Sequence, residues 1–167
     1  MKFVKDLSPK GFLIPPTSMK LAGFQTGQKL EYHAMDNAVA EMKGSMTAME
    51  LLAAAQSLRE LAEELYSHLA KVCGECEDCD AGCPYEGLDV SGIELPDYLR
   101  KEAGIPEEVK LCAEADPETG RVVISDAGYR YDLRDVPREL LERFAESGVS
   151  LCELEERLVT EDTVYGD

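Results

Sequence analysis

The chain has 167 residues, of which 44% are hydrophobic and 7% aromatic, so it has room for one compact domain or for two small units that share a core. Its 17 basic and 34 acidic side chains give a net charge of −17. This charge excludes a protein covered everywhere by positive potential, as nucleic-acid binders usually are. No apolar run reaches the roughly 18–20 residues of a membrane span, and the N-terminal stretch does not resemble a secretory signal. We therefore expect a cytoplasmic protein whose six cysteines are thiols or metal ligands rather than disulfides.

The charge is distributed unevenly along the chain. Residues 1–46 carry six lysines and four acidic residues, a net charge of +2, whereas the other 121 residues carry 11 basic and 30 acidic residues, a net charge of −19. If the protein contacts a polyanion such as DNA, we expect the contact in the first 46 residues. The alternative is that these lysines are solvated and that the acidic body keeps the protein in solution.

The chain contains an internal repeat with an offset of 81 residues. Eight identities fall within 24 positions without a gap. The identical pairs are Leu7 with Leu88, Gly11 with Gly92, Pro15 with Pro96, Lys20 with Lys101, Ala22-Gly23 with Ala103-Gly104, and Lys29-Leu30 with Lys110-Leu111.

Each copy of the repeat predicts the same four elements. A short apolar strand ends at a proline, a helix of about two turns ends at a glycine, and two strands follow as a hairpin. In the first copy these elements are residues 12–15, 16–22, 30–34 and 39–42; in the second they are 93–96, 97–103, 110–114 and 121–124. A unit of roughly 40 residues is too small to bury a core alone, so we expect the two copies to pair.

This order of elements resembles the AbrB/MazE/SpoVT family of swapped-hairpin DNA-binding domains. The resemblance runs through KGFLIPPTSMKLAGFQTGQKLEYHAMDNAVAEM and SGIELPDYLRKEAGIPEEVKLCAEADPETGRVVI. It implies an α+β fold in which two β-α-β-β units, residues 1–44 and 86–127, pair as one swapped-hairpin β-barrel, a pseudo-dimer within a single chain. Residues 45–85 are then an insert, and residues 128–167 a C-terminal tail.

The resemblance also implies DNA binding, although the sequence departs from the family at two positions. The arginine that follows the opening glycine in the family is replaced by Phe12 and Ile93, and the helix arginine is present only as Arg100, with Met19 in the first copy. Arginine contacts to phosphates and bases are a major source of affinity and specificity. The candidate DNA-binding residues are Lys2, Lys5, Lys10, Lys20, Lys29 and Arg100.

The insert begins with a predicted helix. Thr47 and Glu50 have the spacing of a capping box, and apolar residues then recur at alternating intervals of four and three. This stripe consists of Leu51, Ala55, Leu58, Ala62, Leu65, Leu69 and Val72. It favours packing on the chain's own helices; pairing with the same helix of a second chain, which would make a homodimer, is the alternative.

The predicted helix ends in four cysteines spaced C-x2-C-x2-C-x3-C-P, namely Cys73, Cys76, Cys79 and Cys83. This is the spacing of bacterial ferredoxins, and because the run occurs once, a two-cluster ferredoxin is excluded. Four thiolates around one centre suit zinc or an iron–sulfur cluster. The alternative is four reduced thiols in a loop, or disulfides formed on exposure to air. Cys112 and Cys152 are expected to be small buried hydrophobic residues.

The tail predicts a short strand over residues 129–133 and two helices, one beginning at Asp135-Val136-Pro137 and one capped by Ser150. These helices cover the barrel or the insert, or they offer a groove to a partner protein. With two histidines and no phosphate-binding loop, the sequence does not predict an enzyme. We expect a transcription regulator that binds DNA through its basic N-terminal unit. The alternative is an acidic protein–protein interaction or metal-sensing module that keeps the barrel without DNA binding.

Overall fold

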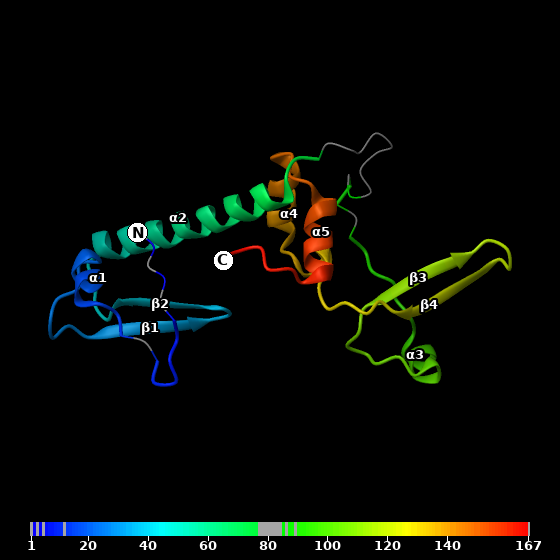
Figure 1. Cartoon of the computed structure of the whole chain (residues 1–167), viewed down its shortest axis with the longest axis horizontal. Coiled ribbons are helices and arrows are strands. Elements are labelled where there is room, and N and C mark those ends of the chain that lie inside the picture. The colour runs from blue at the N-terminus through cyan, green and yellow to red at the C-terminus, as the bar shows by residue number, and fades with distance from the viewer. Residues whose placement is uncertain are drawn as a thin grey trace. The chain divides into compact units, whose positions relative to one another are not determined.

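The computed structural model describes residues 2, 4, 6–11, 13–76, 85, 87, 88 and 90–166. The chain divides into two compact units, Met1–Leu61 and Ala62–Asp167, whose elements are labelled in Figure 1. Within the described part of the chain, no helix combines the length and the apolar character that crossing a membrane requires. The fold is α+β with two separate small sheets, one in each unit.

The first unit contains helix α1 (Pro16–Leu21), strands β1 (Leu30–Met35) and β2 (Ala38–Lys43), and the start of helix α2 (Ala48–Cys73). Strands β1 and β2 pair antiparallel from Leu30 opposite Lys43 to Met35 opposite Ala38. The two-residue turn between them places Asn37 at a φ of +57°, a conformation that asparagine tolerates better than most residues. The predicted capping box forms at the start of α2, where Thr47 N–H donates to Glu50 Oε2 at 2.8 Å and Glu50 N–H donates to Thr47 Oγ1 at 3.3 Å.

The second unit contains the end of α2, helix α3 (Asp97–Ala103), strands β3 (Leu111–Asp116) and β4 (Arg121–Asp126), the 3-10 helix η1 (Leu133–Asp135), and helices α4 (Arg138–Glu146) and α5 (Leu151–Thr160). Ser150 caps α5 as predicted, because its hydroxyl accepts the Glu153 N–H at 3.3 Å. Residues 129–132 form no strand. That prediction is wrong because the alternating residues run into η1 instead of meeting a neighbouring strand.

The repeat is reproduced in the helix and hairpin of each copy. Helices α1 and α3 end in the same way, with Phe24 N–H donating to Met19 O and Ile105 N–H to Arg100 O, both at 2.9 Å. The hairpins have ladders of the same length. Each is closed by one further backbone bond, from Gly44 N–H to Lys29 O in the first copy and from Ala127 N–H to Lys110 O in the second, both at 2.9 Å. The repeat therefore specifies an α-β-β unit.

The predicted swapped-hairpin barrel is wrong. The described strands form two separate two-stranded sheets, β1–β2 and β3–β4, and neither sheet closes. The opening strands predicted at residues 12–15 and 93–96 do not form either: residues 13–15 and 93–96 have no ladder partner, and Phe12 lies outside the described residues. A strand needs a neighbour for its backbone groups, and Pro15 and Pro96 lack the N–H that a ladder requires.

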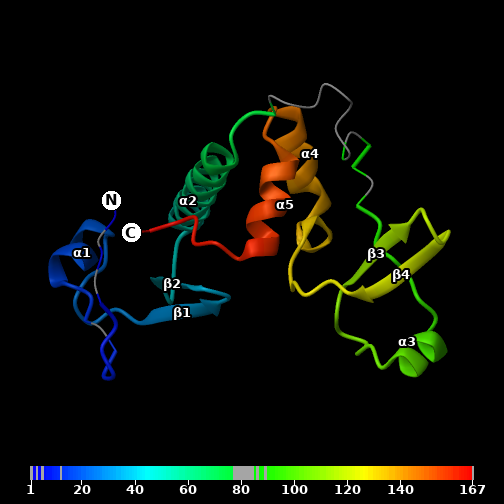
Figure 2. The same cartoon turned by 45° about the vertical axis from the view of Figure 1, so that its right-hand side comes forward.

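The buried apolar side chains of the described residues all belong to the second unit. A cluster joins the end of α2 to η1, α4 and α5, and its members are Cys73, Leu133, Leu141, Phe144, Val149, Leu151 and Leu154. Figures 1 and 2 show α4 and α5 side by side within this unit. Leu69 packs against the cluster, whereas Leu51, Leu58 and Leu65 are exposed, so the predicted stripe of α2 is covered at its C-terminal end.

Candidate functional site

The lysines predicted to bind DNA lie on the surface of the first unit. Lys10 is in the turn closed by the Gly11 N–H to Ser8 O hydrogen bond at 2.8 Å, Lys20 is in the last turn of α1, and Lys29 immediately precedes β1. All three are exposed, and none forms an ion pair with a described residue. Lys2 is also exposed, and Lys5 lies outside the described residues.

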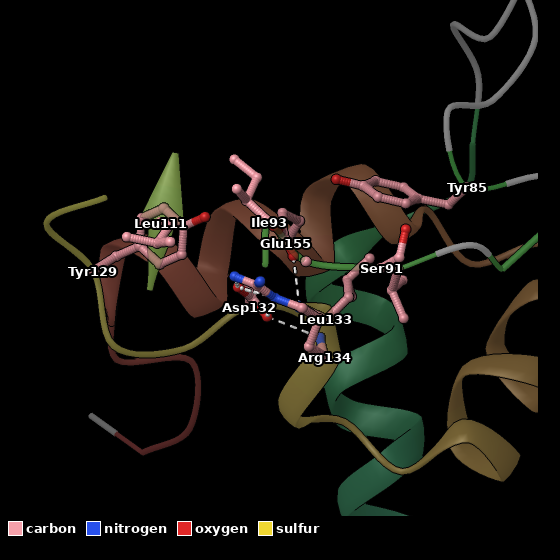
Figure 3. A pocket seen from close by; sticks show the side chains of 11 residues that line it. Tyr85, Ser91, Ile93, Leu111, Tyr129, Asp132, Leu133, Arg134 and Glu155 are labelled. Atoms are coloured by element: carbon pink, nitrogen blue, oxygen red, sulfur yellow. Dashed lines mark hydrogen bonds and ion pairs between the residues drawn. The ribbon is translucent and has the colours of Figure 1, made fainter. Parts of the chain in front are cut away.

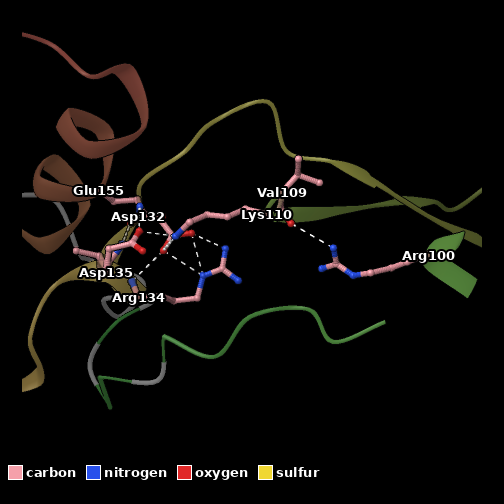
Figure 4. A network of polar contacts seen from close by, with 8 residues as sticks. Arg100, Val109, Lys110, Asp132, Arg134, Asp135 and Glu155 are labelled. Carbon is pink, nitrogen blue, oxygen red and sulfur yellow. Dashed lines mark hydrogen bonds and ion pairs between the residues drawn. The ribbon is translucent and has the colours of Figure 1, made fainter. Parts of the chain in front are cut away.

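Arg100 is placed differently, because it stabilises the loop between α3 and β3. Its Nη1 donates to the backbone oxygens of Pro106 at 2.8 Å, Glu107 at 3.1 Å and Val109 at 3.4 Å. Figure 4 shows the guanidinium reaching the Val109 carbonyl from α3. This nitrogen is therefore engaged inside the second unit.

Of the four cysteines in the predicted metal site, Cys73 and Cys76 belong to the described residues, and Cys79 and Cys83 do not. The segment after α2 pairs with the turn between α4 and α5. Ser150 N–H donates to Gly74 O at 3.0 Å, Cys76 N–H donates to Gly148 O at 3.2 Å, and Glu75 and Val149 form an isolated antiparallel bridge. The start of the cysteine run is thereby fixed to the helical part of the unit.

The two described cysteines have opposite surroundings. Cys73 is 4% exposed in the apolar cluster, and burial raises the pKa of its thiol although the nearby Arg157 opposes that shift. Cys76 is exposed. In the part of the chain that the structure describes, no three metal-ligating groups come together. A metal centre in this run therefore needs ligands from outside the described residues in addition to Cys73 and Cys76.

The other two cysteines, which are half-buried, lie apart from this run in the sequence. Cys112 is in β3, where its Sγ lies 3.3 Å from Ser125 Oγ. Cys152 is in the first turn of α5.

The second unit contains a cluster of charges around one buried carboxylate that the sequence did not predict. Asp132, 2% exposed, lies between two cations: its Oδ1 is 2.7 Å from Lys110 Nζ, and both of its oxygens accept from Arg134 Nε, at 3.0 and 2.9 Å. Lys110 also pairs with Asp135. Figure 4 shows these side chains converging from the start of β3 and from η1. Through these ion pairs, the cluster links the β3–β4 hairpin to η1 and so to the helical part of the unit.

The pKa of the Asp132 carboxyl and that of the neighbouring Glu155 carboxyl are shifted in opposite directions. Burial raises the pKa of Asp132, but hydrogen bonds from Arg134 and Lys110 outweigh burial and bring the pKa to about 2. Glu155 on α5 behaves in the opposite way. Burial raises its pKa, and the single Leu133 N–H that it accepts, at 2.7 Å, does not compensate.

A hollow of about 230 Å³ opens beside this cluster. Figure 3 shows Tyr85, Ile93, Leu111 and Tyr129 around it, with Arg134 and Glu155 at its polar side. A Cβ added at Gly92 would overlap Nη1 of Arg134, so a side chain there would require the guanidinium to shift. Next to the hollow, Arg134 is paired with Asp132, and Glu155 accepts the Leu133 N–H.

Sequence reasoning missed this cluster because Lys110 and Asp132 are far apart in the chain. A local signal was present, since Asp132 and Asp135 form a capping box around η1, the same pattern that identified the start of α2.

The chain matches no protein-family model, no curated protein and no solved structure.

Proposed function

We propose that the protein is a cytoplasmic transcription regulator that resembles the AbrB/MazE/SpoVT family and binds DNA through its first unit. The observation that carries this proposal is the contrast between the two copies of one lysine. Lys110 is half-buried and paired with Asp132 and Asp135, whereas Lys29 is exposed and has no ion pair among the described residues. Together with Lys10 and Lys20, it provides cations that the first unit does not neutralise.

Phosphate contacts are the chemistry that such lysines supply. Each phosphate neutralised by a lysine releases a condensed counterion, so affinity falls as salt rises. The acidic second unit repels DNA, which favours an approach of DNA to the first unit alone. Because Arg100 is engaged with a loop of the second unit, the lysines supply backbone affinity, and sequence readout depends on other groups of the first unit.

The first prediction concerns the lysines of the first unit. We expect the triple variant Lys10→Gln, Lys20→Gln, Lys29→Gln to bind a labelled random duplex at least about tenfold more weakly at low salt, because about three phosphate contacts are lost. Fluorescence anisotropy measures the change.

The matched control is Lys71→Gln, Lys101→Gln, Arg121→Gln, which removes the same charge from exposed residues of the second unit that form no ion pair with described residues. We expect this control to bind like the wild type or more weakly by less than about twofold. Equal losses in both variants would mean that overall charge, and not the first unit, determines binding.

The cysteine run supports a second component of the proposal, a single zinc or iron–sulfur centre held by Cys73, Cys76, Cys79 and Cys83. The spacing of the four thiols suits either group, and the backbone pairing at Gly74 and Cys76 fixes the start of the run. Exposed Cys76 fits the role of a ligand. Cys73 fits this role less well, because a metal ligand must be a thiolate and burial raises the pKa of the Cys73 thiol. A bound metal supplies free energy for the loss of the proton.

The second prediction tests this centre. After anaerobic purification, we expect one zinc per chain, or an absorption band near about 400 nm from an iron–sulfur cluster, and we expect Cys76→Ser to abolish either signal. Metal analysis and the visible spectrum are the measurements, and Cys112→Ser is the control that keeps the signal. A protein without metal and without the band would show that the four cysteines are reduced thiols.

If DNA binding fails, the alternative function is an acidic interaction module. It is supported by the exposed apolar residues of α2, among them Leu51, Leu58 and Leu65, which offer a surface to a partner protein or to a second copy of this helix.

A further inference from the structure

The two copies of the repeat carry the same pair of residues at the start of their hairpins, Lys29-Leu30 and Lys110-Leu111. The backbone around the two pairs is equivalent, because each lysine carbonyl accepts the hydrogen bond that closes its hairpin and each leucine begins a ladder of six residue pairs. A partner that binds at one Lys-Leu pair would therefore find the same backbone arrangement at the other pair.

In the second copy this pair is covered by a segment of the same chain. The Lys110 ammonium, whose side chain is 16% exposed, pairs with Asp132 at 2.7 Å and with Asp135. Leu111 is 4% exposed and lines the same hollow as Leu133, and in Figure 3 it lies beside Tyr129. The covering segment is a turn with two carboxylates three residues apart, and its capping box gives it a fixed shape.

In the first copy the same pair is uncovered. Leu30 is 37% exposed, and Lys29 is exposed without an ion pair among the described residues. After β2 the chain continues into α2, so no acidic turn follows this hairpin. The first unit thus presents the cation and the apolar side chain that the second unit covers.

We propose that the Lys29-Leu30 surface is a docking site for an acidic turn of a partner protein with the pattern Asp-Leu-x-Asp. The two carboxylates pair with Lys29, as Asp132 and Asp135 pair with Lys110, and an apolar residue of the same turn covers Leu30. Charge complementarity and the occupant of the equivalent surface favour this chemistry over an apolar partner. The site does not require DNA binding, and an acidic turn seated on Lys29 competes with a phosphate for that lysine.

The test uses the full-length protein and a labelled peptide of residues 128–137, with blocked termini, as the probe. Because this peptide contains two arginines and two aspartates, bulk charge does not drive its binding. The equivalent surface at Lys110 is already occupied by its own tethered turn, whose effective concentration is far higher than that of a free peptide. We expect saturable binding, and we expect Lys29→Ala to weaken it at least about tenfold.

Two controls make the result specific. Lys20→Ala removes an exposed lysine from α1 and is expected to change the affinity less than about twofold, whereas a peptide with Asp132→Asn and Asp135→Asn is expected to bind at least about tenfold more weakly. Circular dichroism verifies that the variants fold. The proposal is overturned if the peptide does not bind at about 1 mM, if Lys29→Ala binds it as well as the wild type does, or if the amide peptide binds equally well. None of these outcomes involves DNA, so the proposed function stands or fails separately.

Discussion

Replacing Asp132 with alanine is expected to lower the free energy of unfolding of the second unit by about 3–5 kcal/mol. The Asp132 side chain is 3% exposed between Lys110 and Arg134. Removing the carboxylate leaves Lys110, 16% exposed, facing only Asp135, and leaves Arg134 without its bidentate partner. Urea denaturation followed by circular dichroism measures the loss.

Asp126→Ala is the control for this variant, because Asp126 is exposed and its carboxylate accepts only the Gly128 N–H. We expect it to cost about 1 kcal/mol or less. If Asp132→Ala costs no more than Asp126→Ala, the cluster does not fasten the hairpin.

The same cluster makes the free energy of unfolding fall at acidic pH. Because Asp132 has a folded pKa of about 2 against an ordinary value of 3.8, its contribution is complete above pH 3.8 and is lost as the pH falls toward 2. Wild-type protein should therefore lose about 2 kcal/mol more than Asp132→Asn over this range. Glu155 has a raised pKa and contributes with the opposite sign in both proteins. Its contribution is smaller in Asp132→Asn, because the charge of Asp132 is one cause of the raised Glu155 pKa.

Leu141→Ala is expected to lower the free energy of unfolding by about 2–5 kcal/mol. Leu141 is 1% exposed at the centre of the apolar cluster, where the lost methyl groups leave a cavity that α4 and α5 cannot fill without moving. The matched change in α2, Leu58→Ala, removes a side chain that is 44% exposed and should cost less than about 1 kcal/mol. Equal costs at the two positions would show that Leu58 is buried by a contact absent from this structure.

Local sequence signals predicted the helices and hairpins well. Local signals act within a few residues; they are Pro16, the glycine caps Gly23 and Gly104, the capping box at Thr47 and the Ser150 cap. The corresponding helices and ladders form where expected. The opening strands and the barrel depend instead on which segments become neighbours. The repeat shows that two units are alike and does not show that they pair.

The residues of the candidate site also fall into two groups, those whose placement local sequence signals predict and those whose placement depends on contacts between distant segments. The exposure of Lys10, Lys20 and Lys29 follows from their polar character and their places beside turns. The engagement of Arg100 with the Pro106 and Glu107 carbonyls depends on the path of a loop. The pairing of Lys110 with Asp132 depends on a contact across 22 residues of sequence. Such contacts leave no period or spacing in the sequence that could be recognised.

The salt dependence of DNA binding tests the central claim most directly. A labelled random duplex is titrated with the wild-type protein at a series of salt concentrations, and the logarithm of the affinity is plotted against the logarithm of the salt concentration. Contacts from Lys10, Lys20 and Lys29 predict measurable binding at low salt and a slope of about −3. No change in anisotropy at micromolar protein, or an affinity that does not depend on salt, would contradict DNA binding through the first unit.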